Sequence, residues 1–103
     1  MANIVWDICQ SGSFNWNTRG AFVDSGAHLS STSASNLTDG AAGAGSAVEA
    51  VVGHILTIKS DADGRVRFGG VDAQTNVGVL ITADVTEYIE ISHPGTISVI
   101  DLA

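Results

Sequence analysis

The sequence predicts an all-β fold, a small β-sandwich or jelly-roll-like domain with an extended N-terminal strand and a long polar loop. Apolar residues alternate with polar ones in several short runs, which is the period-two pattern of a strand with one buried face. Turn-forming residues separate these runs about every 8 to 12 residues, as in sandwiches and barrels. A chain of 103 residues fits one compact domain, spanning 1–103.

The N-terminal part, residues 1–23, is typical of a strand followed by a hairpin. Ile4, Trp6 and Ile8 fall on one side of an extended chain. Trp16 belongs to a second alternating run, and the NTRG stretch after it has the composition of a turn. We expect this part of the chain to act as an assembly arm.

Residues 24–46 differ in composition and predict a flexible loop rich in Ser, Gly and Ala. Leu29 and Leu37 are its only large apolar residues. So little apolar bulk cannot offset the entropy that is lost when the segment becomes ordered. We expect a loop that is mobile or ordered by a partner, and pinned at the two leucines.

Residues 47–103 are expected to form the main β-sandwich. Residues 47–60 are apolar and β-branched, which favours a strand over a short helix through 46–54. DADG is a hairpin turn, and HPG suits a type II turn because Pro94 fixes φ while Gly95 tolerates a positive φ. Further strands are expected in RVRF, VGVLITA, EYIEIS and TISVIDL.

The stretch RVRFGG raises the question of a phosphate-binding loop. Such a loop places its glycines between a strand and a helix N-terminus, usually with a lysine. Here Gly69 and Gly70 lead into a polar stretch and then into another β-rich run. We therefore expect a half-exposed strand that ends in a tight turn. Arg65 and Arg67 then lie on its outer face, solvated or facing carboxylates of a neighbouring molecule.

The composition favours burial against copies of the chain or against a larger partner. Hydrophobic residues make up 45% of the chain and charged residues only 15%, against about 25% in an ordinary soluble protein. That is more apolar surface than one small domain covers. The formal net charge of −7 counts against nucleic acid, which needs clustered positive charge, and against anionic membranes. No apolar run approaches the roughly 20 residues that span a bilayer.

Cysteine use and the N-terminus bear on where the chain is made. Cys9 is the only cysteine, so an intrachain disulfide is excluded. The first residues lack the basic start, apolar run and cleavage site of a signal peptide. We expect synthesis in a reducing cytoplasm.

The sequence offers no set of residues at the spacing of a catalytic, cofactor or metal site. His28, His54 and His93 are far apart and lack neighbours at metal-ligand spacing. DADG begins like a calcium loop but fails at the next ligand position. No serine lies in a nucleophile elbow, and Glu87 and Glu90, three apart on a strand, point to opposite faces. We expect that the chain is not an enzyme and holds no cofactor or metal.

The C-terminal part of the chain resembles small structural proteins of tailed-phage virions. The resemblance runs from DGRVRFGG through GVLITA and EYIEI to PGTISVID. It is to head decoration (cement) proteins and related fibre-like components. It implies a β-sandwich or jelly-roll protein, often trimeric, that binds the major capsid protein and carries out no catalysis.

The resemblance and the composition together predict an acidic structural protein that is made in the host cytoplasm and resides on the capsid surface of a virion. It would self-associate as a trimer and bridge neighbouring capsid subunits, with no nucleic-acid or membrane partner. The alternative is a carbohydrate- or receptor-binding module of a phage fibre or tail structure, whose aromatic side chains stack on sugars. The residues expected at an interface are Ile4, Trp6, Ile8, Trp16, Leu29, Leu37, Arg65 and Arg67. For Trp6 and Trp16 a place in the core is equally compatible with the sequence.

Overall fold

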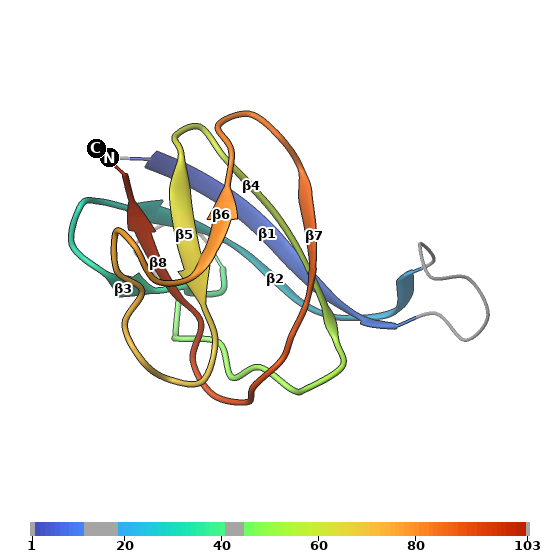
Figure 1. Ribbon diagram of the computed structural model, residues 1–103. Coiled ribbons are helices and arrows are strands. Elements are labelled where there is room, and N and C mark those ends of the chain that lie inside the picture. The colour runs from blue at the N-terminus through green and yellow to red at the C-terminus, as the bar shows by residue number, and fades with distance from the viewer. Residues whose placement is uncertain (1, 12–18, 41–44, 103) are drawn as a thin grey trace.

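The computed structural model describes residues 2–11, 19–40 and 45–102, which form two four-stranded antiparallel sheets packed face to face (Figure 1). No helix occurs among these residues, and the predicted all-β class is confirmed. The strands are β1 (Ala2–Ser11), β2 (Arg19–Ser30), β3 (Ser35–Asn36), β4 (Ile55–Ser60), β5 (Gly64–Arg67), β6 (Val79–Ile81), β7 (Glu87–Glu90) and β8 (Ser98–Asp101).

The strand order places β1 inside one sheet and leaves β6 and β7 as edges. Sheet A has the order β2-β1-β4-β7, and sheet B has the order β3-β8-β5-β6. β1 pairs with β4 from Ile4 opposite Ser60 to Cys9 opposite Ile55. The edge strands β6 and β7 lie on the same side of the sandwich (Figure 1). That side is therefore where the core between the sheets reaches the surface.

The period-two pattern of β1 supplies the centre of the core. Ile4, Trp6 and Ile8 point inward and are buried, while Val5 on the other face is exposed. The three inward side chains were expected at an interface, but they pack inside this chain because sheet B covers the inner face of β1. The other buried core residues are Leu37, Val48, Ala50, Leu56, Ile58, Val66, Phe68, Ile81, Ile91, Ile97 and Val99.

The expected polar loop over 24–46 differs from the structure, because β2 continues to Ser30 and β3 follows at Ser35–Asn36. Leu37, another expected interface residue, is fully buried, and its backbone N–H donates to the oxygen of Ile97 at 2.8 Å. Small residues let this segment lie close to β2. A Cβ on Gly26 would lie 2.4 Å from the backbone oxygen of Thr38. The segment thus contributes to the core although it is poor in apolar residues.

The strand expected from residue 47 begins only at Ile55. Val51 and Val52 are exposed, and the chain turns at Gly53, whose φ is +90°. A positive φ is available to glycine at little cost, and it interrupts a strand. The β-branched residues before Gly53 therefore form an irregular segment rather than a strand.

Two glycine turns form one end of the molecule. Gly69 and Gly70 have φ values of +94° and +73°, and Gly95 has +112°, so the positive φ expected at Gly95 is confirmed and the chain bends at both places. The N–H of Gly70 donates to the oxygen of Thr96 at 3.2 Å. The two turns therefore lie together and fix the segment that follows β5.

Replacing Leu37 with Ala should lower the free energy of unfolding by about 2–5 kcal/mol, because the truncation leaves a cavity in the core. Leu29→Ala is the matched control: Leu29 is 42% exposed, and exposed substitutions usually stay within about 0.5 kcal/mol. Urea denaturation of both variants measures the difference. Equal, small losses would contradict the packing of the segment around Leu37.

Candidate functional site

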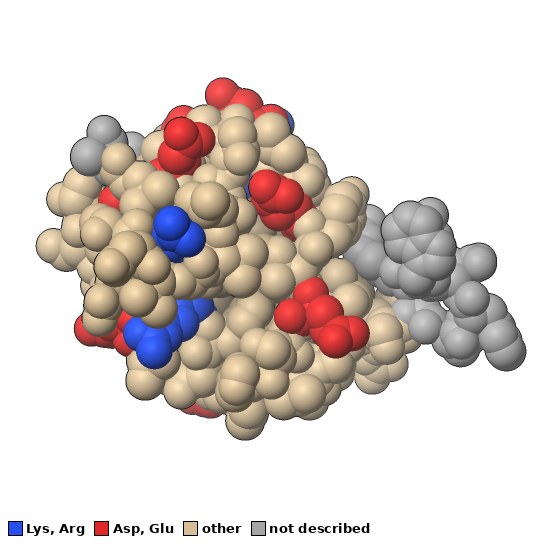
Figure 2. All heavy atoms as spheres, in the orientation of Figure 1, with Lys and Arg blue, Asp and Glu red and all other residues tan. Residues whose placement is uncertain are grey.

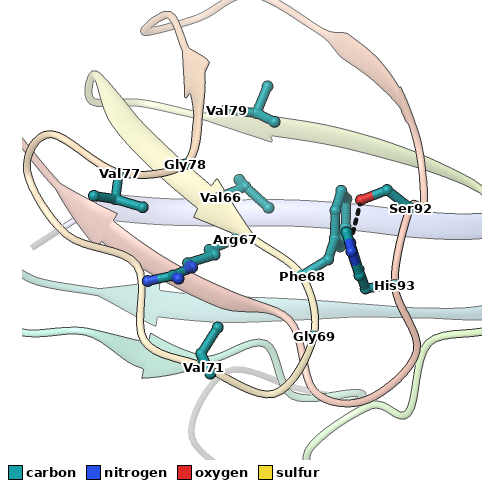
Figure 3. Close-up of a pocket in the computed structure, with 10 residues that line it drawn as sticks. All are labelled: Val66, Arg67, Phe68, Gly69, Val71, Val77, Gly78, Val79, Ser92 and His93. Carbon is teal, nitrogen blue, oxygen red and sulfur yellow. Dashed lines mark hydrogen bonds between the residues drawn. The ribbon is translucent and has the colours of Figure 1, made fainter.

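A pocket of about 400 Å³ opens between the edge strand β6 and the segment that follows β7 (Figure 3). Its size is that of a site for a small ligand or for a few side chains. The residues that line it are Val66, Arg67, Phe68, Gly69, Val71, Val77, Gly78, Val79, Ser92 and His93.

Valines and one phenylalanine form most of the pocket wall. Val66 and Phe68 alternate with the arginines along the chain, so both point into the sandwich, where they are buried. Val79 on β6 lies opposite Val66 and shares its face. It remains 43% exposed because β6 is an edge strand. The pocket therefore exposes Val79 to solvent beside the buried core residues Val66 and Phe68.

The two arginines of β5 hold the loop that closes the pocket. Arg65 donates from Nε to the oxygen of Thr75 at 3.0 Å and from Nη1 to the oxygen of Gly78 at 2.9 Å. Arg67 donates from Nη1 to the oxygen of Asp72 at 3.0 Å. Both arginines were expected to be solvated or to face a neighbour's carboxylates. In the structure they instead bind backbone oxygens of their own chain and are half-buried.

Polar side chains lie on two sides of the pocket. In Figure 3, Arg67 lies on one side of Val66 and His93 lies on the other, beside Phe68. The hydroxyl of Ser92 is 2.9 Å from Nδ1 of His93. The site thus combines an apolar floor with a positive charge at its margin, which suits an apolar group with an acidic neighbour.

The outer face of sheet A carries a second group of exposed apolar side chains. The strand pairing places Val5 of β1, Thr57 of β4 and Tyr88 of β7 on this face. Leu29, opposite Asn3, lies on the same face. Val5 is 56% and Tyr88 65% exposed. We call Val5, Leu29 and Tyr88 the sheet A apolar face.

A buried polar cluster links the two sheets away from the pocket. On β2, His28 has Nε2 2.9 Å from the hydroxyl of Ser35 and Nδ1 3.3 Å from that of Thr38. Ser30, on the same strand, donates to Asp101 of β8 at 2.5 Å. These contacts differ from those of a nucleophile–base–carboxylate triad. The Asp101 carboxylate accepts from Ser30 and not from His28, and both ring nitrogens of His28 face hydroxyl groups. The cluster ties β2 to β3 and β8.

Burial lowers the pKa of His28 below its usual value of 6.5, and the negative charge of Asp101 opposes this effect. Desolvation disfavours the charged imidazolium. The neutral ring can donate to one hydroxyl and accept from the other, so both ring nitrogens are satisfied in that form. The cluster is therefore built for a neutral histidine.

The structure separates the residues that were expected at an interface. Ile4, Trp6, Ile8 and Leu37 are in the core, and Leu29 lies on the sheet A apolar face. Trp16 lies outside the described residues. The sequence analysis missed the pocket because its walls come from β5, β6 and the segment after β7. The local sequence feature that lies at the pocket is the Gly69–Gly70 pair, since Gly69 is one of the lining residues.

Among the described residues, no three or more His, Cys, Asp and Glu side chains gather where they could hold a metal ion. The described part of the chain also has no helix that is long and apolar enough to cross a membrane. Comparison with family models, with curated proteins and with solved structures found no match.

The stability of the protein should fall as the pH drops below about 6.5, because the unfolded chain then binds a proton that buried His28 resists. One such group gives a slope of at most about 1.4 kcal/mol per pH unit. Urea denaturation between pH 5 and pH 8 measures it, and His28→Gln should flatten the curve. The control is His93→Gln, a change at an exposed histidine. This variant should still lose stability at acidic pH, because His28 is intact. Identical curves for the wild type and His28→Gln would contradict this role.

Proposed function

We propose that this chain is a structural protein that associates with copies of itself and reinforces a larger protein assembly. The observation that carries this proposal is the sheet A apolar face, where Val5, Leu29 and Tyr88 are open to solvent on the same outer face of one sheet. Strands with one solvated face normally alternate between apolar and polar residues, so that the outer face is polar. Large apolar side chains on that face indicate a surface that a protein partner covers.

The shape of this face favours a protein over a small molecule. It is the outer side of a sheet, with Val5 on a central strand and Tyr88 on an edge strand. Small ligands prefer concave sites that enclose most of their surface. Protein partners bury broad surfaces, with tyrosine common among the residues that contribute most to binding.

The proposed assembly is the capsid of a tailed phage, with the chain bound as a trimer to the major capsid protein. The resemblance of the C-terminal strands and turns to head decoration proteins supports this choice, and the acidic composition is consistent with it. Several copies linked together bind a repetitive surface more tightly than single copies, because the later attachments are intramolecular. In this role the added buried area raises the free energy needed to separate capsid subunits.

The alternative, a carbohydrate- or receptor-binding module of a fibre or tail structure, is supported by the exposure of Tyr88. A tyrosine ring can stack on a sugar ring. However, Tyr88 lies on the outer face of sheet A and not among the residues that line the pocket. We favour the structural role for this reason.

Replacing Val5 with Glu should weaken self-association at least about tenfold, because the interface would have to bury a carboxylate. The variant should still fold, since Lys59 is the cross-strand neighbour of position 5 on β4. Val85→Glu is the control, because Val85 is 45% exposed and lies outside the strands.

Light scattering over a dilution series measures the association of the wild type and both variants. We expect an oligomer for the wild type and for Val85→Glu, and a smaller mass for Val5→Glu. A wild type that is monomeric at every concentration would overturn the proposal and favour the binding module, which a glycan screen would then test.

A further inference from the structure

We propose that Phe22 of one copy inserts into the pocket of a neighbouring copy, so that copies join head to tail. This inference rests on the proposed self-association and adds to it a contact separate from Val5, Leu29 and Tyr88. One chain contains both an apolar pocket open to solvent and an exposed aromatic side chain elsewhere on its surface. The pocket could bury the aromatic side chain, and the side chain could fill the pocket.

Phe22, near the start of β2, is presented to solvent. Phe22 is 65% exposed, and its neighbour Val23 is also exposed. The register between the two strands shifts after Ile8 and again after Cys9, so the hairpin is irregular where Phe22 lies. In Figure 1 the described ends of β1 and β2 extend beyond β7 and away from the rest of the sandwich. The hairpin can therefore reach a second molecule.

The pocket has the size and lining that a phenyl ring needs. A dry cavity of about 150 Å³ lined by apolar side chains can hold a benzene molecule. The pocket measures about 400 Å³, which leaves room for the Phe22 ring and for a second side chain such as Val23. Val71 and Val79, which are exposed, would contact the ring, and Phe68 offers an aromatic partner within the same wall (Figure 3).

Opposite charges lie near the two partners. Asp7 is on the outer face of sheet A with Phe22, because it is two positions along β1 from Cys9, which is opposite Phe22. The pocket carries Arg67, which donates to the backbone oxygen of Asp72. Figure 2 shows two groups of basic atoms over the region of β5, the lower of them beside acidic atoms at the margin of the view. Asp7 of one copy and Arg67 of the next can therefore attract each other.

The contact must form between molecules. Phe22 lies opposite Cys9, which lies opposite Ile55, so all three belong to the outer face of sheet A. The pocket is instead lined by residues of sheet B, including Val66 and Val79. A contact between two different surfaces is heterologous, and repeating it around an axis closes a ring. A closed ring of this kind is compatible with a trimer.

Disulfide trapping tests the contact, in a background where Cys9 is replaced by Ala and light scattering shows the wild-type mass. One protein carries Val23→Cys, which keeps Phe22. A second protein, with a tag of different size, carries Val71→Cys at the pocket. Val85→Cys is the matched control, because Val71 and Val85 are 46% and 45% exposed. A disulfide requires Cα atoms roughly 4.4–6.8 Å apart, so only a docked hairpin brings the pair together.

We expect the mixed disulfide to form at least about tenfold faster with Val71→Cys than with Val85→Cys. Adding Phe22→Ser to the Val23→Cys protein should remove this preference, because a central aromatic anchor commonly contributes a tenfold factor or more to binding. Since Phe22 is exposed, this substitution should leave the fold intact, as thermal unfolding can check.

The other outcomes separate this inference from the proposed function. Equal trapping with Val71→Cys and Val85→Cys in a protein that remains oligomeric would overturn the hairpin-to-pocket contact and leave self-association standing. The same conclusion follows if Phe22→Ser does not reduce trapping. A monomeric mass at every concentration would overturn both.

Discussion

The packing around Trp6 is the contact on which the rest of the sandwich depends. Its side chain is buried, and its ring nitrogen donates to the backbone oxygen of Thr38 at 3.1 Å. Gly26, on the neighbouring strand, lets the same segment approach closely, because a Cβ there would meet both Thr38 and the Trp6 ring. One large residue on β1 thereby fixes the path of a segment more than 30 positions later. Leu37 and β3 then take their places over the core and close that side of the sandwich.

The sandwich is closed along the edge strands β2 and β3, and it is open along the edge strands β6 and β7. The β2 and β3 side is joined by backbone hydrogen bonds, including one from Ala27 to Gly40 at 2.9 Å. On the other side, the pocket lies between the edge strand β6 and the segment that follows β7. The loop over residues 71–78 beside the pocket is held in place by Arg65 and Arg67. The arginines bind carbonyl oxygens, so the loop is fixed without neutralising their charge. The result is an apolar opening with a basic margin.

The sequence predicted those parts of the fold whose signals are local. Alternation in β1 and β5 and the glycines at 69, 70 and 95 identify strands and turns directly. The segment 24–40 could not be predicted in this way, because what orders it is long-range: β1 beside it and the ring of Trp6 beneath it. Its serines and glycines look like a loop in sequence, although in space their small size is what permits the close packing.

The candidate site was less predictable for the same reason. Trp6 and Leu37 look like anchors for a partner when only size and composition are considered, but the fold buries them. The exposed apolar residues are smaller or less conspicuous in sequence: Val5 in an alternating strand and Phe22 beside a turn. Which side of a strand faces solvent depends on the sheet that covers the other side. That arrangement cannot be deduced from one strand alone.

The distribution of charge constrains how copies of this chain can meet. A formal charge of −7 makes two copies repel at long range. Association is then favoured where a basic region of one copy meets an acidic region of the next, and two of the four basic residues, Arg65 and Arg67, lie on β5. A contact that places like surfaces together would bring carboxylates such as Asp7 face to face. The proposed head-to-tail contact would instead set Arg67 of one copy near Asp7 of the next, so repulsion that hinders other orientations would act as a source of specificity.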